Sequence, residues 1–416
     1  METGYWLRCL SCGREFPAGP LLYGCPSCKQ NGSRSAVEVQ YDYDGLAMPA
    51  RTALAQGRTF WDYSPLLPLL PETSFVSLGE GNTPLVRSHR IGPTLGFRGL
   101  YFKNETANPT WSFKDRYNAV TVAVARSLGF RRVVNSSTGN HGASVAAYAA
   151  AAGMDCIILC PPEVSETLQL QVSIYGGQVV ITEWEGRAIL MEHLAQHRGW
   201  FPAGLFMPFS ISNPYGVEGY KTFAYEIWRE LHEVPEHIFF PCARGNGLYG
   251  CWKGWKELQR YGLVNTVPRH HATQPEGAAP LVCSFEQGMR KSAVVDNPHS
   301  VAMSTRESVS SDQALDAIYA SGGTAVSVDD DEILAAVKAL GREGLCVEPA
   351  SALPVAAVVK LANQERLYRD ATIICVLTAA GIKWPLGMQA ASPRAAVAVD
   401  PTPAELDRLL DSWGWR

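Results

Sequence analysis

The stretch Asn108-Pro109-Thr110-Trp111-Ser112-Phe113-Lys114-Asp115-Arg116 sets one lysine among small, polar and aromatic residues, where a helix is expected to begin. Ser112 can cap that helix and Asp115 can complete a capping box, so the Lys114 side chain would leave the first turn in a defined direction. An amine forms a Schiff base only when deprotonated, and the positive helix end together with Arg116 would lower its pKa. We predict that Lys114 is a reactive amine suited to covalent catalysis. The alternative is a solvated lysine on a helix surface.

The composition is that of a large globular protein. With 416 residues, 46% hydrophobic and 18% charged, the chain can bury two or more cores. A formal net charge of -4 predicts no general attraction to nucleic acid or to an anionic membrane, and the longest apolar runs are too short to span a bilayer. Because the first residues lack the apolar segment of a signal peptide, we expect a cytoplasmic protein that acts on a small molecule.

Four of the eleven cysteines form two CxxC pairs near the start of the chain. Cys9 and Cys12 are separated from Cys25 and Cys28 by twelve residues. Each CxxC turn can place two thiolates on one face of a tetrahedron, and four thiolates leave no open position on the metal. The pattern predicts a structural zinc ribbon over residues 1–34. The alternatives are two disulfides or a site that has lost its metal.

A strand, a polar loop and a helix follow one another in the next part of the chain. A buried strand ends at Val134, the loop occupies 135–142, an alanine-rich helix is expected over 143–152, and the next strand over 156–160. This βαβ pattern predicts a parallel sheet, whose loops at the carboxyl ends of strands are where open α/β sheets bind ligands. The hydroxyls and backbone N–H groups of this loop suit a carboxylate; the alternative is an ordinary helix cap.

A second loop of this kind contains glycines. A buried strand over 237–242 leads into Ala243-Arg244-Gly245-Asn246-Gly247, and a helix is expected over 248–261. Backbone N–H groups can approach a phosphate closely where glycine removes the Cβ, and the helix dipole adds attraction, so the loop is a predicted anion cradle. A later strand, 373–377, ends at Thr378, whose hydroxyl would face the same site.

Several further motifs accompany these loops, and their order along the chain is informative. They are Gly79–Leu85, Asn108–Arg116, Ser137–Asn140, Asn213-Pro214 with Glu218–Thr222, Glu348–Ala352, and Thr378 with Gly381–Lys383. Together they resemble the threonine synthase family, within the second fold type of pyridoxal phosphate (PLP) enzymes. The resemblance implies a two-domain α/β fold similar to tryptophan synthase β, with parallel sheets and flanking helices. The implied parts are the ribbon, a large PLP-binding domain over 35–100 and 218–395, a small domain over 101–217, and a helical tail over 396–416.

The resemblance also implies roles for individual residues. Lys114 would form the Schiff base with PLP and later act as acid and base. A neutral hydroxyl at the pyridine nitrogen would favour elimination and replacement chemistry. The implied contacts are Phe113 beside the ring, Asn140 at the phenolic oxygen, Thr378 at the pyridine nitrogen, Ala243, Arg244, Gly245, Asn246 and Gly247 around the cofactor phosphate, and Ser137, Thr138, Gly139 and Asn140 around the substrate carboxylate.

The sequence departs from the family at positions associated with the substrate. Family members usually show glycine where Trp111 stands, arginine where Gly216 stands and asparagine where Arg244 stands. The loss at Gly216 removes a bidentate guanidinium fork, and Arg244 could restore that charge from another wall. We therefore expect Trp111, as a buried indole that narrows the pocket, and Arg244 to contact the substrate.

The family reaction would convert O-phosphohomoserine and water into threonine and phosphate. The departures indicate a specialised relative that acts on an amino acid with an anionic or otherwise activated leaving group. A threonine or serine dehydratase is the enzymatic alternative, and a regulatory homologue that only binds a ligand is the non-catalytic one. By analogy with the family, we expect a homodimer.

Overall fold

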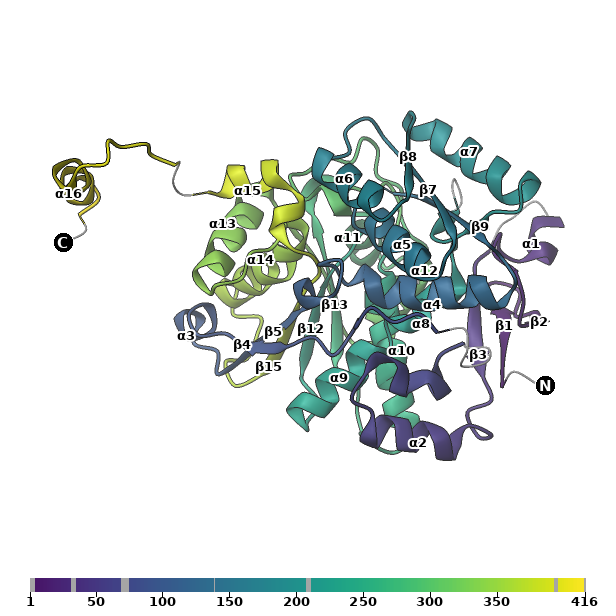
Figure 1. The fold of residues 1–416 in the computed structure, drawn as a ribbon. Helices are drawn as coiled ribbons and strands as arrows, with labels where there is room; N and C mark the ends of the chain where they lie inside the picture. The colour runs from purple at the N-terminus through teal and green to yellow at the C-terminus, as the bar shows by residue number, and fades with distance from the viewer. Residues whose placement is uncertain are drawn as a thin grey trace.

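Two sheets carry the fold of the computed structural model, which describes residues 4–30, 35–68, 75–137, 139–206, 211–392 and 396–414. The larger sheet has six strands, in the order β14 (Ala325–Val328), β13 (Arg269–Pro275), β12 (His237–Pro241), β15 (Thr372–Leu377), β5 (Gly99–Asn104) and β4 (Leu85–Arg87). The smaller sheet has four, in the order β8 (Gln178–Ile181), β7 (Asp155–Cys160), β6 (Arg132–Ser136) and β9 (Phe201–Pro202). Neighbouring strands are parallel except β4 and β5. The predicted α/β fold with parallel sheets is confirmed (Figure 1).

Helices flank both sheets (Figure 1). Those that position the site are α4 (Lys114–Ser127), α5 (Asn140–Ala151), α8 (Pro214–Gly219), α9 (Thr222–Leu231), α10 (Asn246–Arg260) and α14 (Pro349–Asn363). The remaining α-helices are α1 (Pro26–Gln30), α2 (Ala47–Gln56), α3 (Ile91–Leu95), α6 (Glu166–Ile174), α7 (Trp184–His197), α11 (Pro280–Glu286), α12 (Asp312–Ser321), α13 (Asp330–Arg342), α15 (Pro385–Ala391) and α16 (Pro403–Ser412). Two of the expected helices begin earlier than the sequence suggested, α5 by three residues and α10 by two.

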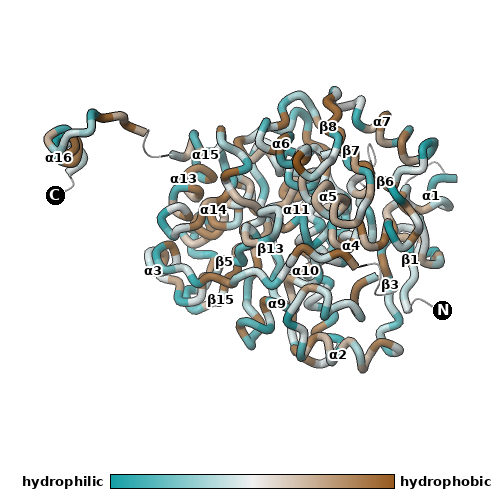
Figure 2. Tube along the Cα trace, viewed as in Figure 1, coloured by the Kyte–Doolittle hydropathy of each residue, from teal (hydrophilic) through white to brown (hydrophobic). Residues whose placement is uncertain are grey.

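The central strand β15 shows why the larger sheet is covered on both faces. Ile374 and Val376 join one buried cluster with residues of α9, α10 and α12, whereas Ile373, Cys375 and Leu377 join another with α13 and α14. Successive side chains of a strand point to opposite faces, so a strand buried on both sides needs a continuous apolar run. Figure 2 shows such hydrophobic segments along the strands and inner helices, with hydrophilic residues on much of the outer surface.

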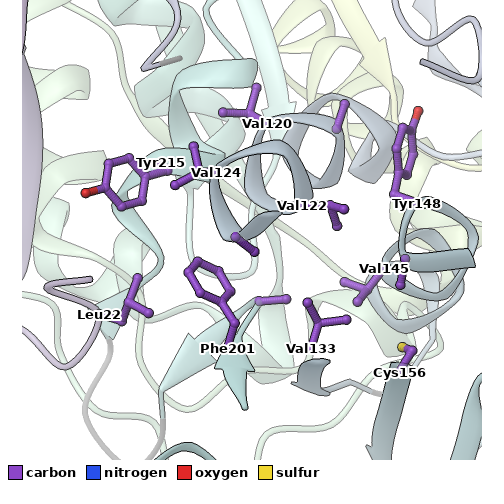
Figure 3. Close-up of a cluster of buried hydrophobic side chains, with 14 of the residues drawn as sticks. Leu22, Val120, Val122, Val124, Val133, Val145, Tyr148, Cys156, Phe201 and Tyr215 are labelled. Carbon is purple, nitrogen blue, oxygen red and sulfur yellow. The ribbon is translucent and has the colours of Figure 1, made fainter. Parts of the chain in front are cut away.

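The smaller sheet shares its core with α4 and α5. In Figure 3, Val122 of α4, Val145 of α5 and Val133 of β6 belong to one buried cluster, and Leu22 and Tyr215 extend that cluster toward the start of the chain. The small side chains of the alanine-rich helix α5 allow it to lie close to α4. The position of the first turn of α4, where Lys114 stands, is therefore set by a packed core behind it.

The N-terminal segment forms a three-stranded antiparallel sheet of β1 (Tyr5–Cys9), β2 (Glu15–Pro17) and β3 (Val37–Tyr41). Because β3 pairs with β1 along its whole length, this sheet continues beyond residue 34, where the sequence placed the end of the ribbon. It packs against α8 and α10, since the Tyr41 hydroxyl donates to Glu218 at 3.0 Å and Lys253 donates to the Val39 carbonyl at 2.5 Å.

The domain boundaries drawn from the sequence stay a prediction. The strand β5 crosses the boundary between residues 100 and 101, because it pairs with β15 as far as Asn104. Figure 1 shows the last helix, α16, apart from the rest of the chain, and none of its described residues is buried. Among the described residues, every helix is too short or too polar to cross a membrane.

Candidate active site

The lysine predicted to be reactive is the first residue of α4. The Ser112 hydroxyl accepts from the Lys114 backbone N–H at 3.3 Å, which fixes the start of the helix. The predicted capping box is wrong, because the Asp115 carboxylate points inward instead. It accepts from the Thr110 N–H at 2.7 Å and from the Ser144 hydroxyl at 2.6 Å. The lysine backbone is thus held by a buried carboxylate that ties α4 to α5.

Burial changes the ionisation of this lysine. It lowers the pKa of the Lys114 amine to about 8, against the opposing negative charges of Glu348 and Glu307. A lowered pKa makes the neutral, nucleophilic amine accessible near physiological pH. The predicted lowering of the Lys114 pKa is confirmed, but its cause is burial of the amine.

The sequence had assigned part of this effect to Arg116, and that assignment is wrong. The Arg116 guanidinium lies in a double fork between two buried carboxylates. Its Nε donates to Glu105 at 2.7 Å, and an Nη group donates to Glu226 at 2.6 Å. Because two carboxylates already neutralise it, the guanidinium is part of the scaffold beneath the lysine.

The loop predicted to bind a carboxylate leads into α5. The Ser137 hydroxyl accepts from the Gly139 N–H at 3.1 Å and from the Gly142 N–H at 3.0 Å, so it serves as the helix cap that was the alternative interpretation. Thr138 lies outside the described residues. The Asn140 amide donates to Glu348 at 2.9 Å, while its Oδ1 is buried with no hydrogen-bond partner among the residues that the structure describes. A buried amide oxygen without a partner is expected where a ligand or water completes the site.

Two buried charged side chains join this site although the sequence gave them no role. Glu348 precedes α14 and accepts from Asn140 and from the Ser304 hydroxyl, the latter at 2.6 Å; burial raises its pKa. Lys383 donates to the Thr110 carbonyl at 2.8 Å, and burial lowers its pKa to about 8. Glu348 belongs to the motif Glu348–Ala352 and Lys383 to the motif Gly381–Lys383. A charged residue next to an apolar helix or strand was the signal that could have identified both as site residues.

The glycine loop after β12 approaches the same place. Gly245 has a left-handed backbone, with φ 83, and α10 begins directly after it. A Cβ at Gly247 would lie 3.1 Å from the Phe113 ring, so this position brings bare backbone against the residue that precedes the lysine. Asn246 donates to the Ser212 hydroxyl at 2.7 Å. The loop is thus a helix start with little side-chain cover, and its predicted role as an anion cradle stays a prediction.

Phe113 and Thr378 also meet beside the lysine. The Phe113 N–H donates to the Thr378 carbonyl at 2.8 Å, and the Lys114 Nζ lies 4.5 Å from the Phe113 ring centroid. The Thr378 hydroxyl is 3.0 Å from the Ser351 hydroxyl of α14. The structure therefore brings the lysine, the aromatic ring beside it, the threonine and the glycine loop together from three segments.

Trp111 and Arg244 are the two departures expected to contact substrate; the structure contradicts the predicted burial of Trp111, and the substrate contact of Arg244 stays a prediction. Trp111 has a left-handed backbone, with φ 61, and remains 47% exposed, so the expected buried indole is wrong. Glycine adopts this conformation without strain, which gives a physical reason for the family's usual residue there. Arg244 forms an ion pair with Glu307 at 2.9 Å. At Gly216 a Cβ would lie 2.4 Å from both Thr121 Oγ1 and Tyr117 Cε1, so no side chain fits.

The four cysteines of the ribbon form a compact cluster. Their sulfur atoms all lie within 4.8 Å of one another, and within the described part of the chain none of the four forms a disulfide. The predicted alternative of two disulfides is not formed, and four thiols match in number and type the ligands of a tetrahedral zinc site, which stays a prediction. The sulfurs of Cys9 and Cys28, and those of Cys12 and Cys25, are 3.7 Å apart.

Comparison with known proteins gives a consistent set of similarities. The family described as "Pyridoxal-phosphate dependent enzyme" matches residues 76–379. The threonine synthase of Methanocaldococcus jannaschii is 35% identical over 409 residues, which cover 96% of this chain and 96% of that protein. The threonine synthase of Methanosarcina acetivorans is 33% identical over 416 residues, covering 98% and 97%.

Solved structures show the same fold at lower identity. Maize serine racemase superposes with a TM-score of 0.64 and 22% identity, covering 74% of this chain and 91% of that one. Threonine deaminase isoform 2 from Solanum lycopersicum superposes with a TM-score of 0.66 and 20% identity, covering 86% and 95%. At these identities the likeness concerns the fold.

Proposed function

Because this chain belongs to the threonine synthase family of pyridoxal-phosphate dependent enzymes, we propose that it replaces an anionic leaving group on an amino acid, with O-phosphohomoserine as the first candidate substrate. It is a PLP-dependent lyase of the threonine synthase type. The observation that carries the proposal is the similarity to threonine synthases over nearly the whole chain, with a buried amine at the start of α4. The leaving group and the nucleophile are the parts that need an experiment.

The residues of the site fit PLP. Asn140 has a buried amide oxygen without a partner among the described residues, and the loop at Gly245 and Gly247 presents backbone at the start of α10. Bound PLP would supply a ring that withdraws electrons from the substrate's α-carbon. Lys114 would hold it through Nζ, the backbone N–H groups of residues 243–247 would receive its phosphate, and the Thr378 hydroxyl would face its pyridine nitrogen.

The same residues would then handle substrate and protons. Residues 137–140, with the Asn140 N–H at the first position of α5, would orient the substrate carboxylate. The Nζ of Lys114, with its pKa lowered to about 8 by burial, could both accept and return a proton. Glu348 holds the Asn140 amide by accepting its hydrogen bond, which would fix that amide against the cofactor. Half-exposed Trp111 would stand at the edge of the site.

Analysis of the products tests the proposed reaction. We expect purified holoenzyme given O-phosphohomoserine to release phosphate and threonine in equal amounts without ammonia, because a replacement reaction keeps the amino group. Serine, threonine, O-phosphoserine and O-acetylated amino acids serve as comparison substrates. Release of ammonia and a 2-oxo acid from serine or threonine would instead make the chain a dehydratase. Absence of turnover with every substrate would favour a ligand-binding homologue.

We propose a structural zinc ion for Cys9, Cys12, Cys25 and Cys28, whose clustered sulfurs support it. The ribbon contacts α8 through the Tyr215 hydroxyl, which donates to the Gly19 carbonyl at 2.5 Å, so metal binding would stabilise the chain beyond the ribbon. A cytoplasmic location and a homodimer are proposed by analogy with the family.

Metal analysis with two matched variants tests the zinc site. We expect about one zinc per chain. Replacement of the exposed ligand in Cys12→Ser should release it and lower the thermal unfolding midpoint. Cys346→Ser changes another exposed cysteine, outside the cluster, and should retain zinc. Purified protein that lacks zinc while all four thiols remain reactive would contradict the proposal.

A further inference from the structure

An ion pair lies on the loop that follows β12. The Arg244 guanidinium contacts the Glu307 carboxylate at 2.9 Å. The arginine side chain is 10% exposed and the glutamate side chain 34% exposed, so the pair reaches from the interior to solvent. Two hydrogen bonds hold the Arg244 loop to the segment that follows Glu307: the Ser311 N–H donates to the Arg244 carbonyl at 3.0 Å, and the Ser310 hydroxyl donates to the Ala243 carbonyl at 2.5 Å.

This pair belongs to the surroundings of Lys114. The negative charge of Glu307 opposes the effect of burial on the pKa of the lysine, as does that of Glu348. Ser304, three residues before Glu307, donates to Glu348 at 2.6 Å. On the other side, Gly247 of the Arg244 loop lies against Phe113. The segment that carries Glu307 and the loop that carries Arg244 therefore both border the site.

The other position expected from the family to provide a guanidinium is closed in this chain. Thr121 and Tyr117 occupy the space that any side chain at Gly216 would need. The Tyr117 hydroxyl also donates to the Asn213 carbonyl at 3.1 Å, which ties the ring to the residue that caps α8. A substrate anion would therefore meet Arg244, which already has a carboxylate partner.

We propose that Glu307 is a specificity-determining residue, which holds Arg244 until the anionic leaving group of the substrate displaces it. This inference rests on the proposed function. A phosphate ester brings up to two negative charges and can accept two N–H groups of the guanidinium, so it can replace a carboxylate. A hydroxyl or an acetyl ester brings no charge, and breaking the pair for it would leave a buried guanidinium poorly compensated.

The exposures of the two side chains indicate which of them moves. Glu307 is one-third exposed and can turn toward water with little loss of solvation, whereas Arg244 is nearly buried and stays in the site. The pair would then discriminate against neutral leaving groups without any further contact to the substrate. Its strength is that of a partly exposed ion pair, so its effect on substrate affinity is modest.

The test uses Glu307→Gln in the holoenzyme. We expect the KM for O-phosphohomoserine to fall roughly twofold to fivefold with kcat nearly unchanged, because the competing carboxylate is gone. Inorganic phosphate should bind more tightly by the same factor, measured through its effect on the absorbance of the bound cofactor. Glu332→Gln is the matched control, since Glu332 of α13 is also about one-third exposed, at 32%, and forms an ion pair with Lys360 of α14 at 3.2 Å. Glu332→Gln should change neither the KM for O-phosphohomoserine nor the affinity for phosphate.

The phosphate titration keeps this inference separate from the proposed reaction. If the wild-type protein does not turn over O-phosphohomoserine, the proposed substrate fails, but tighter phosphate binding by Glu307→Gln would still support the role of the pair. Equal phosphate binding by the wild type and Glu307→Gln would overturn it. The inference would also be overturned if the double variant Glu307→Gln/Arg244→Gln still bound phosphate more tightly than the wild type, provided that the absorbance shows the cofactor still bound.

Discussion

Replacing Lys114 with alanine is expected to lower turnover by roughly 10³-fold or more, because the variant loses both the amine that holds PLP and the group that moves protons. Borohydride should then no longer fix the cofactor to the peptide that spans the start of α4. The readouts are the rate of product release, the absorbance of the protein with added PLP, and peptide mass spectrometry after reduction. Residual, non-covalent binding of PLP through the 243–247 loop is compatible with this result.

Lys383 provides the critical comparison. It is a second buried lysine, and burial lowers its pKa to about 8 as well. Its Nζ donates to the Thr110 carbonyl, which supports a positioning role under the turn before the lysine. If borohydride attaches the cofactor to Lys383 in the wild-type protein, the assignment of Lys114 is wrong. Lys360→Ala, a partly exposed lysine on α14, should leave both attachment and turnover unchanged.

The sequence was most informative where a local pattern has a single physical cause. Strands that end in polar or glycine-containing loops predicted the places where the chain approaches Phe113 and Lys114, because parallel strands direct their carboxyl ends to one edge of a sheet. Two CxxC pairs likewise predicted a cluster of four sulfurs, which the structure contains. For the strand–loop–helix units and for the CxxC pairs alike, residues close in sequence are enough to define the local geometry.

Long-range partners could not be predicted in this way. Asn140 and Glu348 are 208 residues apart, and their hydrogen bond depends on how two sheets are placed. Arg116 looked like a nearby positive charge for the lysine, but its side chain points into the scaffold. Trp111 looked like a pocket wall from its size, yet its left-handed backbone leaves the indole half exposed. Side-chain direction and burial, which decide charge and pocket shape, are properties of the folded chain.

The second large effect is expected from Glu226→Gln, which should destabilise the protein by about 3–5 kcal/mol. Two Nη groups of Arg116 donate to Glu226, at 2.6 and 2.7 Å, and Lys103 contacts the same carboxylate at 2.9 Å. All three side chains are buried. A glutamine at position 226 would remove one of the carboxylates that neutralise the buried cations Arg116 and Lys103. Although burial opposes ionisation, the charges of Arg116 and Lys103 hold the pKa of Glu226 below its usual value.

Thermal unfolding followed by circular dichroism measures this effect, with Asp155→Asn as the matched control. Asp155 forms an exposed pair with Arg132 at 3.5 Å, and losing it should cost less than about 1 kcal/mol. If Glu226→Gln does not fold, Glu226→Asp retains the charge and should recover part of the stability. Equal unfolding midpoints for Glu226→Gln and Asp155→Asn would contradict the role of the network.

The same network predicts how the stability depends on pH. Because Glu226 keeps a depressed pKa when folded, its contribution to the free energy of unfolding is present at neutral pH. That contribution should be lost as the pH falls below about 4.3, the usual pKa of glutamate.

We expect this network to link stability and catalysis at the start of α4. Arg116 stands two residues after Lys114, and its fork connects α4 to Glu226 of α9 and to Glu105, directly after β5. A change that weakens the fork would let the first turn of α4 shift, and the amine would lose its position relative to Asn140 and Thr378. Conditions in which Glu226→Gln remains folded should therefore show reduced kcat together with weaker cofactor attachment, whereas Asp155→Asn should show neither.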